Sequence, residues 1–371
     1  MNAADSSKRN RVIYKNCNVN GKITDIEVTD GVFSAIGPTE EDGIDLNGAD
    51  VFPGLIDIHC HGSYGYSIYG VDDSLIEDAL KNICAYYAKC GITTWYPTTA
   101  APAEKLQHLL SFDFNSFKGA NIGGLHLEGP YLSPNKAGAI HPGNMRLPNV
   151  DDFDNYEKIK FITVAPELEG AIDYIKEMSG KVRISIGHTC ADYDTAMDAI
   201  KAGASCLNHT FNAMPPLHHR DAGPIGAAIS SDIYAEAICD GIHLHPSIVK
   251  MLYRTFGRDK MIMVSDTVAG AGLPDGEFVI DGKTRVIKDG VIKNANGNLA
   301  GSWCNLFEDV KRAISFGIPR EDAYYMASTT PANYIGINKG RIEVGYDADF
   351  IVVTKDNELL KTVIGGEIFK E

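Results

Sequence analysis

The chain has 371 residues, of which 44% are hydrophobic and 22% charged, a composition typical of a soluble globular protein with a large core. Its formal net charge of −15 argues against binding to nucleic acid or to an anionic membrane, although one basic pocket can still hold an anionic small molecule. No apolar run approaches the roughly 20 residues that span a bilayer, and the first residues lack the apolar core of a secretory signal. The eight cysteines form no CxxC pair, so we expect reduced, mostly buried thiols and a cytoplasmic location.

Both ends of the chain are rich in predicted strands. Residues 11–52 contain short β segments separated by the turn signals Asn20-Gly21 and Asp30-Gly31, and residues 349–353 and 361–364 resemble two further strands, as hairpin patterns require. We expect residues 1–52 and 346–371 to form a small β-sandwich domain, with residues 53–345 as a larger domain inserted between them.

The middle of the chain alternates short apolar strands with segments of helix length. Expected strands cover residues 55–59, 93–97, 124–128, 161–165, 183–188, 206–209, 235–240 and 261–266. Helical segments include 74–90, 103–110, 170–179 and 246–256. Eight such repeats predict an α/β fold with a (β/α)8 TIM-like barrel. A doubly wound sheet is the alternative. Residues 277–293 indicate an extra β-hairpin after the eighth strand.

Residues that commonly bind metals stand at the ends of five of these strands. Side chains two apart on a strand point the same way, so His59 and His61 project together. The other strand ends carry Glu128, His188, His209 and Asp266. The carboxyl ends of barrel strands converge on one face, so we expect these side chains to surround one point. A cluster of imidazoles and carboxylates there predicts a Zn²⁺ or Fe²⁺ site.

The motifs at these strand ends resemble those of N-acetylglucosamine-6-phosphate deacetylases, within the amidohydrolase superfamily. The matching stretches are FPGLIDIHCHG (52–62), GLHLEGPYLS (124–133), SIGHT (185–189), NHTFNAM (208–214), CDGIHLHP (239–246), VSDT (264–267) and LAGS (299–302). They follow the family's order, and the strands at the termini also resemble the family's accessory domain.

The resemblance implies a divalent metal cofactor, Zn or Fe, with one or two ions per subunit. Glu128, His188 and His209 are the implied principal ligands, and His59 and His61 would serve a second site. A metal ion lowers the pKa of water so that it can attack an amide at neutral pH. Asp266 is then expected to move the proton from the water to the leaving amine, while His141 helps to stabilise the oxyanion.

The resemblance also implies a substrate, an amino-sugar phosphate, and a homodimer. Arg220 would bind the phosphate, since guanidinium pairs with phosphate through two hydrogen bonds. The remaining expected substrate contacts are Ile140, Asn212, Ala213, His243, Leu299 and Ser302. The expected reaction releases acetate from N-acetyl-D-glucosamine 6-phosphate, with no nucleic-acid or membrane partner.

Three alternatives remain at this point. The chain could be another amidohydrolase, such as a D-amino-acid deacylase, a dihydroorotase or an isoaspartyl dipeptidase, against which the Glu128-Gly129-Pro130 motif and Arg220 argue. It could be a non-catalytic homologue, although every expected ligand and Asp266 are present. The true substrate could also be an acetamido sugar without a phosphate.

Overall fold

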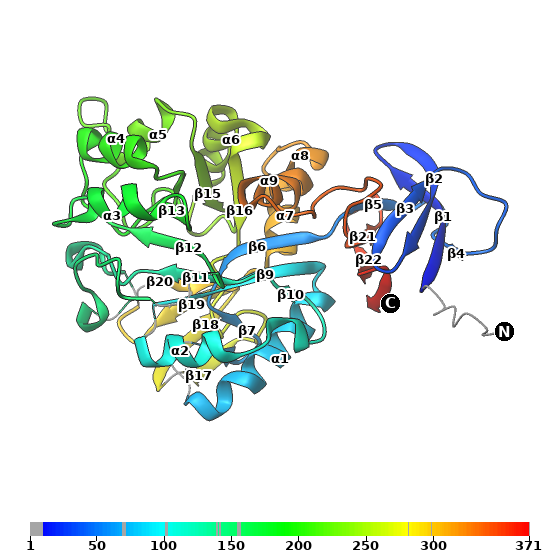
Figure 1. Ribbon diagram of the computed structural model, residues 1–371, viewed down its shortest axis with the longest axis horizontal. Helices are drawn as coiled ribbons and strands as arrows, with labels where there is room; N and C mark the ends of the chain where they lie inside the picture. The colour runs from blue at the N-terminus through cyan, green and yellow to red at the C-terminus, as the bar shows by residue number, and fades with distance from the viewer. Residues whose placement is uncertain are drawn as a thin grey trace, which may run out of the picture.

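A computed structural model describes residues 10–68, 72–100, 103–138, 140, 142–153, 157–280, 282–297 and 299–370. Figure 1 shows a barrel wrapped by helices and, beside it, a smaller β unit in which strands from both termini lie together. Among the residues described, no helix combines the length and the apolar character that a bilayer crossing requires.

Eight parallel strands form the barrel, and each of the eight expected strands is confirmed. They are β6 (Leu55–Cys60), β9 (Ile92–Thr99), β11 (Leu125–Glu128), β12 (Ile159–Val164), β13 (Arg183–Ile186), β14 (Cys206–Leu207), β15 (Tyr234–Ile238) and β16 (Met261–Val264). Short β10 (Asn121–Ile122) adds to the edge of β9. The residues of these strands are almost all buried, because helices cover the outside and side chains fill the inside.

The barrel closes where β16 meets β6. The Asp266 amide donates to the His59 carbonyl at 2.9 Å, and Cys60 pairs with Thr267 in a parallel bridge. Closure therefore occurs at the carboxyl ends of the first and last strands. It brings His59 and Asp266 together although 207 positions separate them in the sequence (266 − 59).

Helices cover the outside of the barrel through apolar stripes. In α1 the buried positions Ile76, Leu80, Ile83 and Tyr87 recur every three or four residues and face the strands, as an amphipathic helix requires. The α-helices are α1 (Asp73–Lys89), α2 (Ala103–Ser111), α3 (Ala171–Met178), α4 (Tyr193–Ala202), α5 (Gly223–Ile229), α6 (Pro246–Lys260), α7 (Leu306–Ser315), α8 (Arg320–Met326) and α9 (Thr329–Ile335).

The connection after β11 departs from the expected repeat of strand and helix. In the described part of residues 129–158 the chain forms only 3-10 turns, η2 (Pro134–Lys136) and η3 (Pro142–Asn144). A further 3-10 turn, η1 (Phe114–Ser116), follows α2. Irregular chain above the carboxyl ends of barrel strands is where binding residues are commonly found.

The segment expected to be a hairpin over residues 277–293 is a four-stranded antiparallel sheet, so that prediction was too short. It comprises β17 (Gly276–Ile280), β18 (Lys283–Lys288), β19 (Val291–Asn294) and β20 (Leu299–Ser302). The LAGS stretch over 299–302 is its fourth strand. Ile287, Ile292 and Ala300 form a small core of this inserted sheet, and three strands suffice for such a core where a lone hairpin does not.

Strands from both termini form one continuous eight-stranded sheet, in place of two separate layers. These are β1 (Arg11–Val19), β2 (Lys22–Thr29), β3 (Val32–Ile36), β4 (Ile44–Asp45), β5 (Asp50–Pro53), β21 (Phe350–Val353), β22 (Leu359–Ile364) and β23 (Glu367–Lys370). The sheet curls so that Val32 pairs with Asp347, and it encloses a core that includes Tyr14, Phe33 and Phe350. The expected sandwich therefore has its two layers joined by hydrogen bonds. Two-stranded β7 (Gly62–Ser63) and β8 (Tyr66–Ser67) complete the strands.

The eight cysteines are confirmed as mostly buried thiols. Six of them are buried, Cys90 is half-buried and Cys190 is exposed, and none of them forms a disulfide.

Candidate active site

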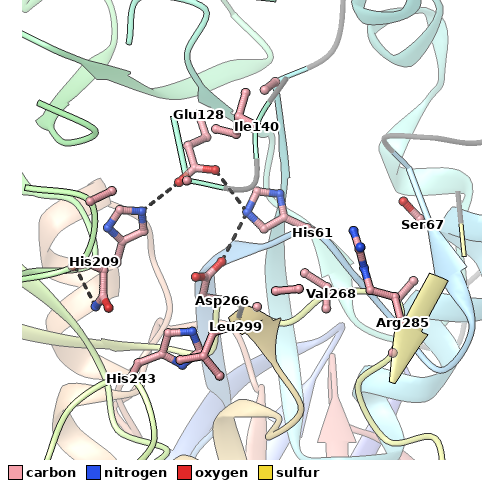
Figure 2. A pocket seen from close by; sticks show the side chains of 18 of the residues that line it. His61, Ser67, Glu128, Ile140, His209, His243, Asp266, Val268, Arg285 and Leu299 are labelled. Atoms are coloured by element: carbon pink, nitrogen blue, oxygen red, sulfur yellow. Dashed lines mark hydrogen bonds and ion pairs between the residues drawn. The ribbon is translucent and has the colours of Figure 1, made fainter. Parts of the chain in front are cut away.

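The carboxylate of Glu128, at the end of β11, lies at the centre of the predicted cluster (Figure 2). Its Oε1 atom is 3.0 Å from His188 Nε2 and 3.0 Å from His209 Nε2, and its Oε2 atom is 3.3 Å from His61 Nε2. Asp266 Oδ1 is 3.3 Å from the same His61 nitrogen. The expectation that side chains from distant strand ends meet at one point is confirmed.

His59 lies at the base of this cluster and is completely buried. Its Nε2 atom is 3.4 Å from Glu128 Oε1 and 3.6 Å from Asp266 Oδ1 and has no hydrogen-bond partner. Its Nδ1 atom is 3.0 Å from Glu236 Oε2. Because a carboxylate only accepts, Nδ1 carries a hydrogen, and Nε2 is the atom of this ring that can offer a lone pair to a cation once its own proton is displaced.

Glu236, on β15, accepts hydrogen bonds from two residues of the cluster, His59 and His209. The same Oε2 atom that faces His59 also accepts the backbone N–H of His209 at 3.0 Å, and the residue is 1% exposed. Burial opposes its charged form, but the contacts with His59 outweigh burial and hold the pKa of Glu236 below its usual range. An ionised carboxylate therefore stands behind His59.

Four residues of the site have left-handed backbone conformations, which non-glycine residues rarely adopt. Their φ angles are 46° at His188, 23° at His209, 50° at Ala213 and 50° at Asp266. Such conformations cost of order 1–3 kcal/mol each and persist where the surrounding structure imposes them. The barrel therefore turns the chain sharply at its strand ends and directs these side chains inward.

The charged groups of the cluster shift one another's pKa. Burial opposes the charged form of His61, but hydrogen bonds to Asp266 and Glu128 outweigh it and raise the pKa of His61 to about 9. Burial likewise opposes ionisation of Asp266, but the charge of His59 and the hydrogen bond from His61 hold the pKa of Asp266 well below its usual range. Burial also opposes ionisation of Glu128, but the charges of His188 and His59 outweigh it and lower the pKa of Glu128. Asp266 and Glu128 are therefore both ionised at neutral pH.

His126, on the same face of β11 as Glu128, has both ring nitrogens occupied. Nδ1 donates to the Ile58 carbonyl at 2.9 Å, so Nε2 accepts from the Thr163 hydroxyl at 3.0 Å. Burial, and then the charge of His59, lowers the pKa of His126 to about 4. His126 is therefore a neutral, hydrogen-bonded residue that packs beside His59 and has no lone pair to offer a metal.

The donor set fits a divalent cation. Glu128, His188 and His209 each offer an atom within 4.8 Å of the others, and so do His59, His61 and Glu128. His188 Nδ1 is 2.7 Å from the Lys136 carbonyl and donates to it, so Nε2 is the ring atom left to bind a cation, and it lies 3.0 Å from the Nε2 atom of His209. Two imidazole nitrogens and a carboxylate converging with an unpartnered His59 Nε2 form a set that Zn²⁺ or Fe²⁺ accepts.

Above the cluster lies a cavity of about 330 Å³, of the size that small-molecule sites commonly have. Its floor contains His61, Glu128, His188, His209 and Asp266. Several expected substrate contacts also line it, namely Ile140, Asn212, Ala213, His243 and Leu299.

His243 is fixed in this wall by a buried carboxylate. Its Nδ1 atom is 2.7 Å from Asp240 Oδ2. Burial opposes its charged form, but the hydrogen bond from His243 to Asp240 outweighs it and raises the pKa of His243. The ring therefore has a fixed orientation and can donate to a ligand from Nε2.

Three of the expected site residues that the structure describes, His59, Arg220 and Ser302, do not line the cavity. Arg220 is exposed, and its Nη1 atom faces His219 Nε2 at 2.7 Å. Ser302 is 1% exposed, and its hydroxyl lies 3.4 Å from Asp240 Oδ2. His141 falls outside the described residues.

The sequence reasoning missed four residues of this site. Asn208 Nδ2 donates to Glu128 Oε1 at 3.2 Å, Glu236 supports His59, and Lys283 and Arg285 of the inserted sheet line the cavity. A signal was available for Glu236, because a carboxylate inside the apolar stretch Tyr234–Ile238 is rarely buried without a partner. None was available for Lys283 and Arg285, since the face that β18 turns to the barrel depends on packing.

The amino-acid sequence matches a known family. The amidohydrolase family profile matches residues 51–369, most of the chain and all of the strand ends described above. The chain belongs to the amidohydrolase family. Its metal dependence is a property of that family, and the cluster around Glu128 provides the ligand types that it needs.

Similar proteins include two named deacetylases and a solved complex. An N-acetylglucosamine-6-phosphate deacetylase of Vibrio furnissii is 34% identical over 94% of this chain and 88% of its own. An N-acetylgalactosamine-6-phosphate deacetylase of Escherichia coli O157:H7 is 29% identical over 92% of this chain and 94% of its own. A variant of N-acetyl-D-glucosamine-6-phosphate deacetylase from Mycobacterium smegmatis, in complex with N-acetyl-D-glucosamine-6-phosphate, superposes with a TM-score of 0.89 at 27% identity, over 97% of this chain and all of that one.

Proposed function

We propose that this amidohydrolase hydrolyses N-acetyl-D-glucosamine 6-phosphate to D-glucosamine 6-phosphate and acetate. The observation that carries the proposal is the convergence of Glu128, His188 and His209 under a cavity of about 330 Å³, in a chain similar over most of its length to deacetylases of this substrate.

Glu128, His188 and His209 are the proposed principal metal ligands, and His59 and His61 the proposed ligands of a second site. The ring orientations support this assignment, because hydrogen bonds at Nδ1 of His59 and His188 turn the Nε2 atoms toward Glu128, where a cation can take their lone pairs in place of a proton. A divalent cation supplies Lewis acidity there, which polarises an amide carbonyl and makes water acidic enough to attack it at neutral pH.

Asp266 is the proposed general base and acid. Its carboxylate borders the cavity and is ionised at neutral pH, so it can accept the proton of the attacking water. It can then deliver that proton to the amine nitrogen as the C–N bond breaks, which yields the amine and acetic acid, and the acid ionises to acetate at neutral pH. His141 is proposed to stabilise the oxyanion, as the family resemblance implies.

The cavity wall is proposed to bind the sugar. Ile140 and Leu299 offer apolar contacts, and Asn212, the backbone at Ala213 and His243 offer polar ones, with Ser302 supporting the wall through Asp240. Arg220 is the proposed phosphate ligand from the family resemblance. Because it is exposed and outside the cavity of its own chain, we place that contact at the neighbouring subunit of a homodimer.

We propose that residues 1–52 with 346–371 form the small β domain, that residues 53–345 form the hydrolase barrel, and that the enzyme acts in the cytoplasm.

The direct test is acetate release by purified protein, with and without a chelator. We expect release from N-acetyl-D-glucosamine 6-phosphate that chelation abolishes and metal restores. The C4 epimer, N-acetyl-D-galactosamine 6-phosphate, is the informative second substrate, because one relative is named for it. A higher kcat/KM for the epimer would move the assignment to that sugar, and full turnover after chelation would remove the metal mechanism.

A further inference from the structure

Two basic side chains of the inserted sheet line the cavity, and the proposed function gives neither of them a role. Lys283 and Arg285 lie on β18 and line the cavity together with Ile280. Residues two apart on a strand share one face, and the next residue on this face, Ile287, is 2% exposed. The inner face of β18 therefore runs from buried Ile287, through half-buried Arg285 at the cavity wall, to exposed Lys283 at the rim.

Arg285 has no counter-ion within the described part of the chain. No carboxylate there lies within ion-pair distance of it, and its guanidinium makes no hydrogen bond to a described residue. Figure 2 shows the side chain extending from β18 into the cavity near Ser67 and Val268. Five other described arginines are paired with carboxylates, namely Arg11, Arg146, Arg258, Arg320 and Arg341.

An unpaired guanidinium in a cavity wall needs an anion when a ligand displaces water from around it. Leaving such a charge desolvated and unpaired is costly, whereas a bound anion offsets that cost. The fork of an arginine matches the geometry of a phosphate group, with two parallel hydrogen bonds. A neutral acetamido sugar offers Arg285 no such partner, while a sugar phosphate does.

We propose that Arg285, with Lys283 at the rim, forms an anion subsite in the chain's own cavity that takes the phosphate group of the substrate. This subsite rests on the proposed function and deepens it. It makes selection for a phosphorylated sugar a property of the inserted sheet within one chain, in addition to any contact that Arg220 makes from a second chain.

The test compares kcat and KM for acetate release from N-acetyl-D-glucosamine 6-phosphate and from unphosphorylated N-acetyl-D-glucosamine. For Arg285→Gln we expect KM for the phosphorylated sugar to rise on the order of 10- to 100-fold, the range of a lost charge-assisted hydrogen bond. Its kcat, and KM for the neutral sugar, should stay within a few-fold of wild type. Arg285→Lys keeps the charge and loses the fork, so its KM should lie between the two.

Lys288→Gln is the matched control, because Lys288 is exposed on the opposite face of the same strand. It removes one positive charge from β18 without changing the cavity, and its KM values should equal those of wild type. An equal rise in Lys288→Gln would show a general effect of charge, and it would overturn the subsite.

A second measurement separates failure of the subsite from failure of the proposed function. Inorganic phosphate should bind wild type, detected by calorimetry or as competitive inhibition, and Arg285→Gln should weaken that binding by a similar factor. If wild type releases no acetate from either sugar but Arg285→Gln still loses phosphate binding, the proposed function fails and the subsite stands. If Arg285→Gln keeps both the preference for the phosphorylated sugar and the phosphate affinity, while Arg220→Gln loses them, the subsite is refuted.

Discussion

Replacing Glu236 with glutamine tests whether a carboxylate outside the cavity sets the metal affinity. Its Oε2 atom accepts from His59 Nδ1 and from the His209 backbone N–H, both at 3.0 Å. Glutamine keeps the volume and removes the charge, and its amide can turn an N–H toward His59 where an acceptor is needed. The imidazole then loses the partner that fixes its tautomer and raises the basicity of Nε2.

The expected effect follows from those two hydrogen bonds. Losing the carboxylate partner of a ligating imidazole typically weakens metal binding by about 10- to 100-fold, equivalent to about 1.4–2.8 kcal/mol. One buried donor left unsatisfied costs about 1–3 kcal/mol of the free energy of unfolding. Glu236→Gln should therefore fold, with a lower melting temperature and a lower metal content per chain after dialysis against a weak chelator.

The assay is metal content by elemental analysis, combined with competition against a chelator of known affinity. Glu167→Gln is the matched control, because Glu167 also accepts two hydrogen bonds, from Thr189 and from the Cys190 backbone at 2.6 Å, without contacting an imidazole. It should bind metal as wild type does. Metal affinity in Glu236→Gln equal to that of wild type would refute the reasoning, since His59 would then need no support from Glu236.

Two further predictions concern the chemistry and its dependence on pH. Asp266→Asn should lower kcat for acetate release by about 10²- to 10⁴-fold, the usual contribution of a positioned general acid or base, while a metal content below that of wild type would show that Asp266 acts as a ligand instead. Chelated protein should lose stability as pH rises from 6.5 to about 9, because the raised pKa of His61 makes its imidazolium contribute below 6.5 and lose that contribution as the proton leaves. The rise in melting temperature on adding metal should grow over the same pH range, since metal competes with that proton. His61→Asn should make the stability of the chelated protein fall less over this range. An equal loss of stability in that variant would contradict the assignment to His61.

The barrel and the convergence of imidazoles and carboxylates at its strand ends were predictable because their signals are local. Each strand is a short, largely apolar run, and each expected ligand lies at the end of one. The position of His61 or Glu128 at its strand end therefore predicts the direction of its side chain. The rule that carboxyl ends of barrel strands share one face then brings them together. The observed order of the barrel strands is the one that the alternation of strand and helix already implied.

The inserted sheet and the small β domain were only partly predictable. The signals over 277–293 indicated a hairpin, but a two-stranded unit has no core of its own, and Ile287 becomes buried only when Ala300 of β20 packs against it. In the same way the terminal strands were expected as a sandwich, and whether its layers join depends on the pairing of β5 with β21, between residues about 300 positions apart.

Sequence alone determined which atoms are available for the chemistry: imidazoles and carboxylates at five strand ends, in motifs that resemble one family of deacetylases. Tertiary structure decided which side chains share the site. It placed Glu236 behind His59, turned Arg285 into the cavity, and left Arg220 outside the cavity of its own chain. The reason is that a strand's direction follows from local alternation, whereas the face it presents to a neighbour depends on contacts between segments far apart in the chain.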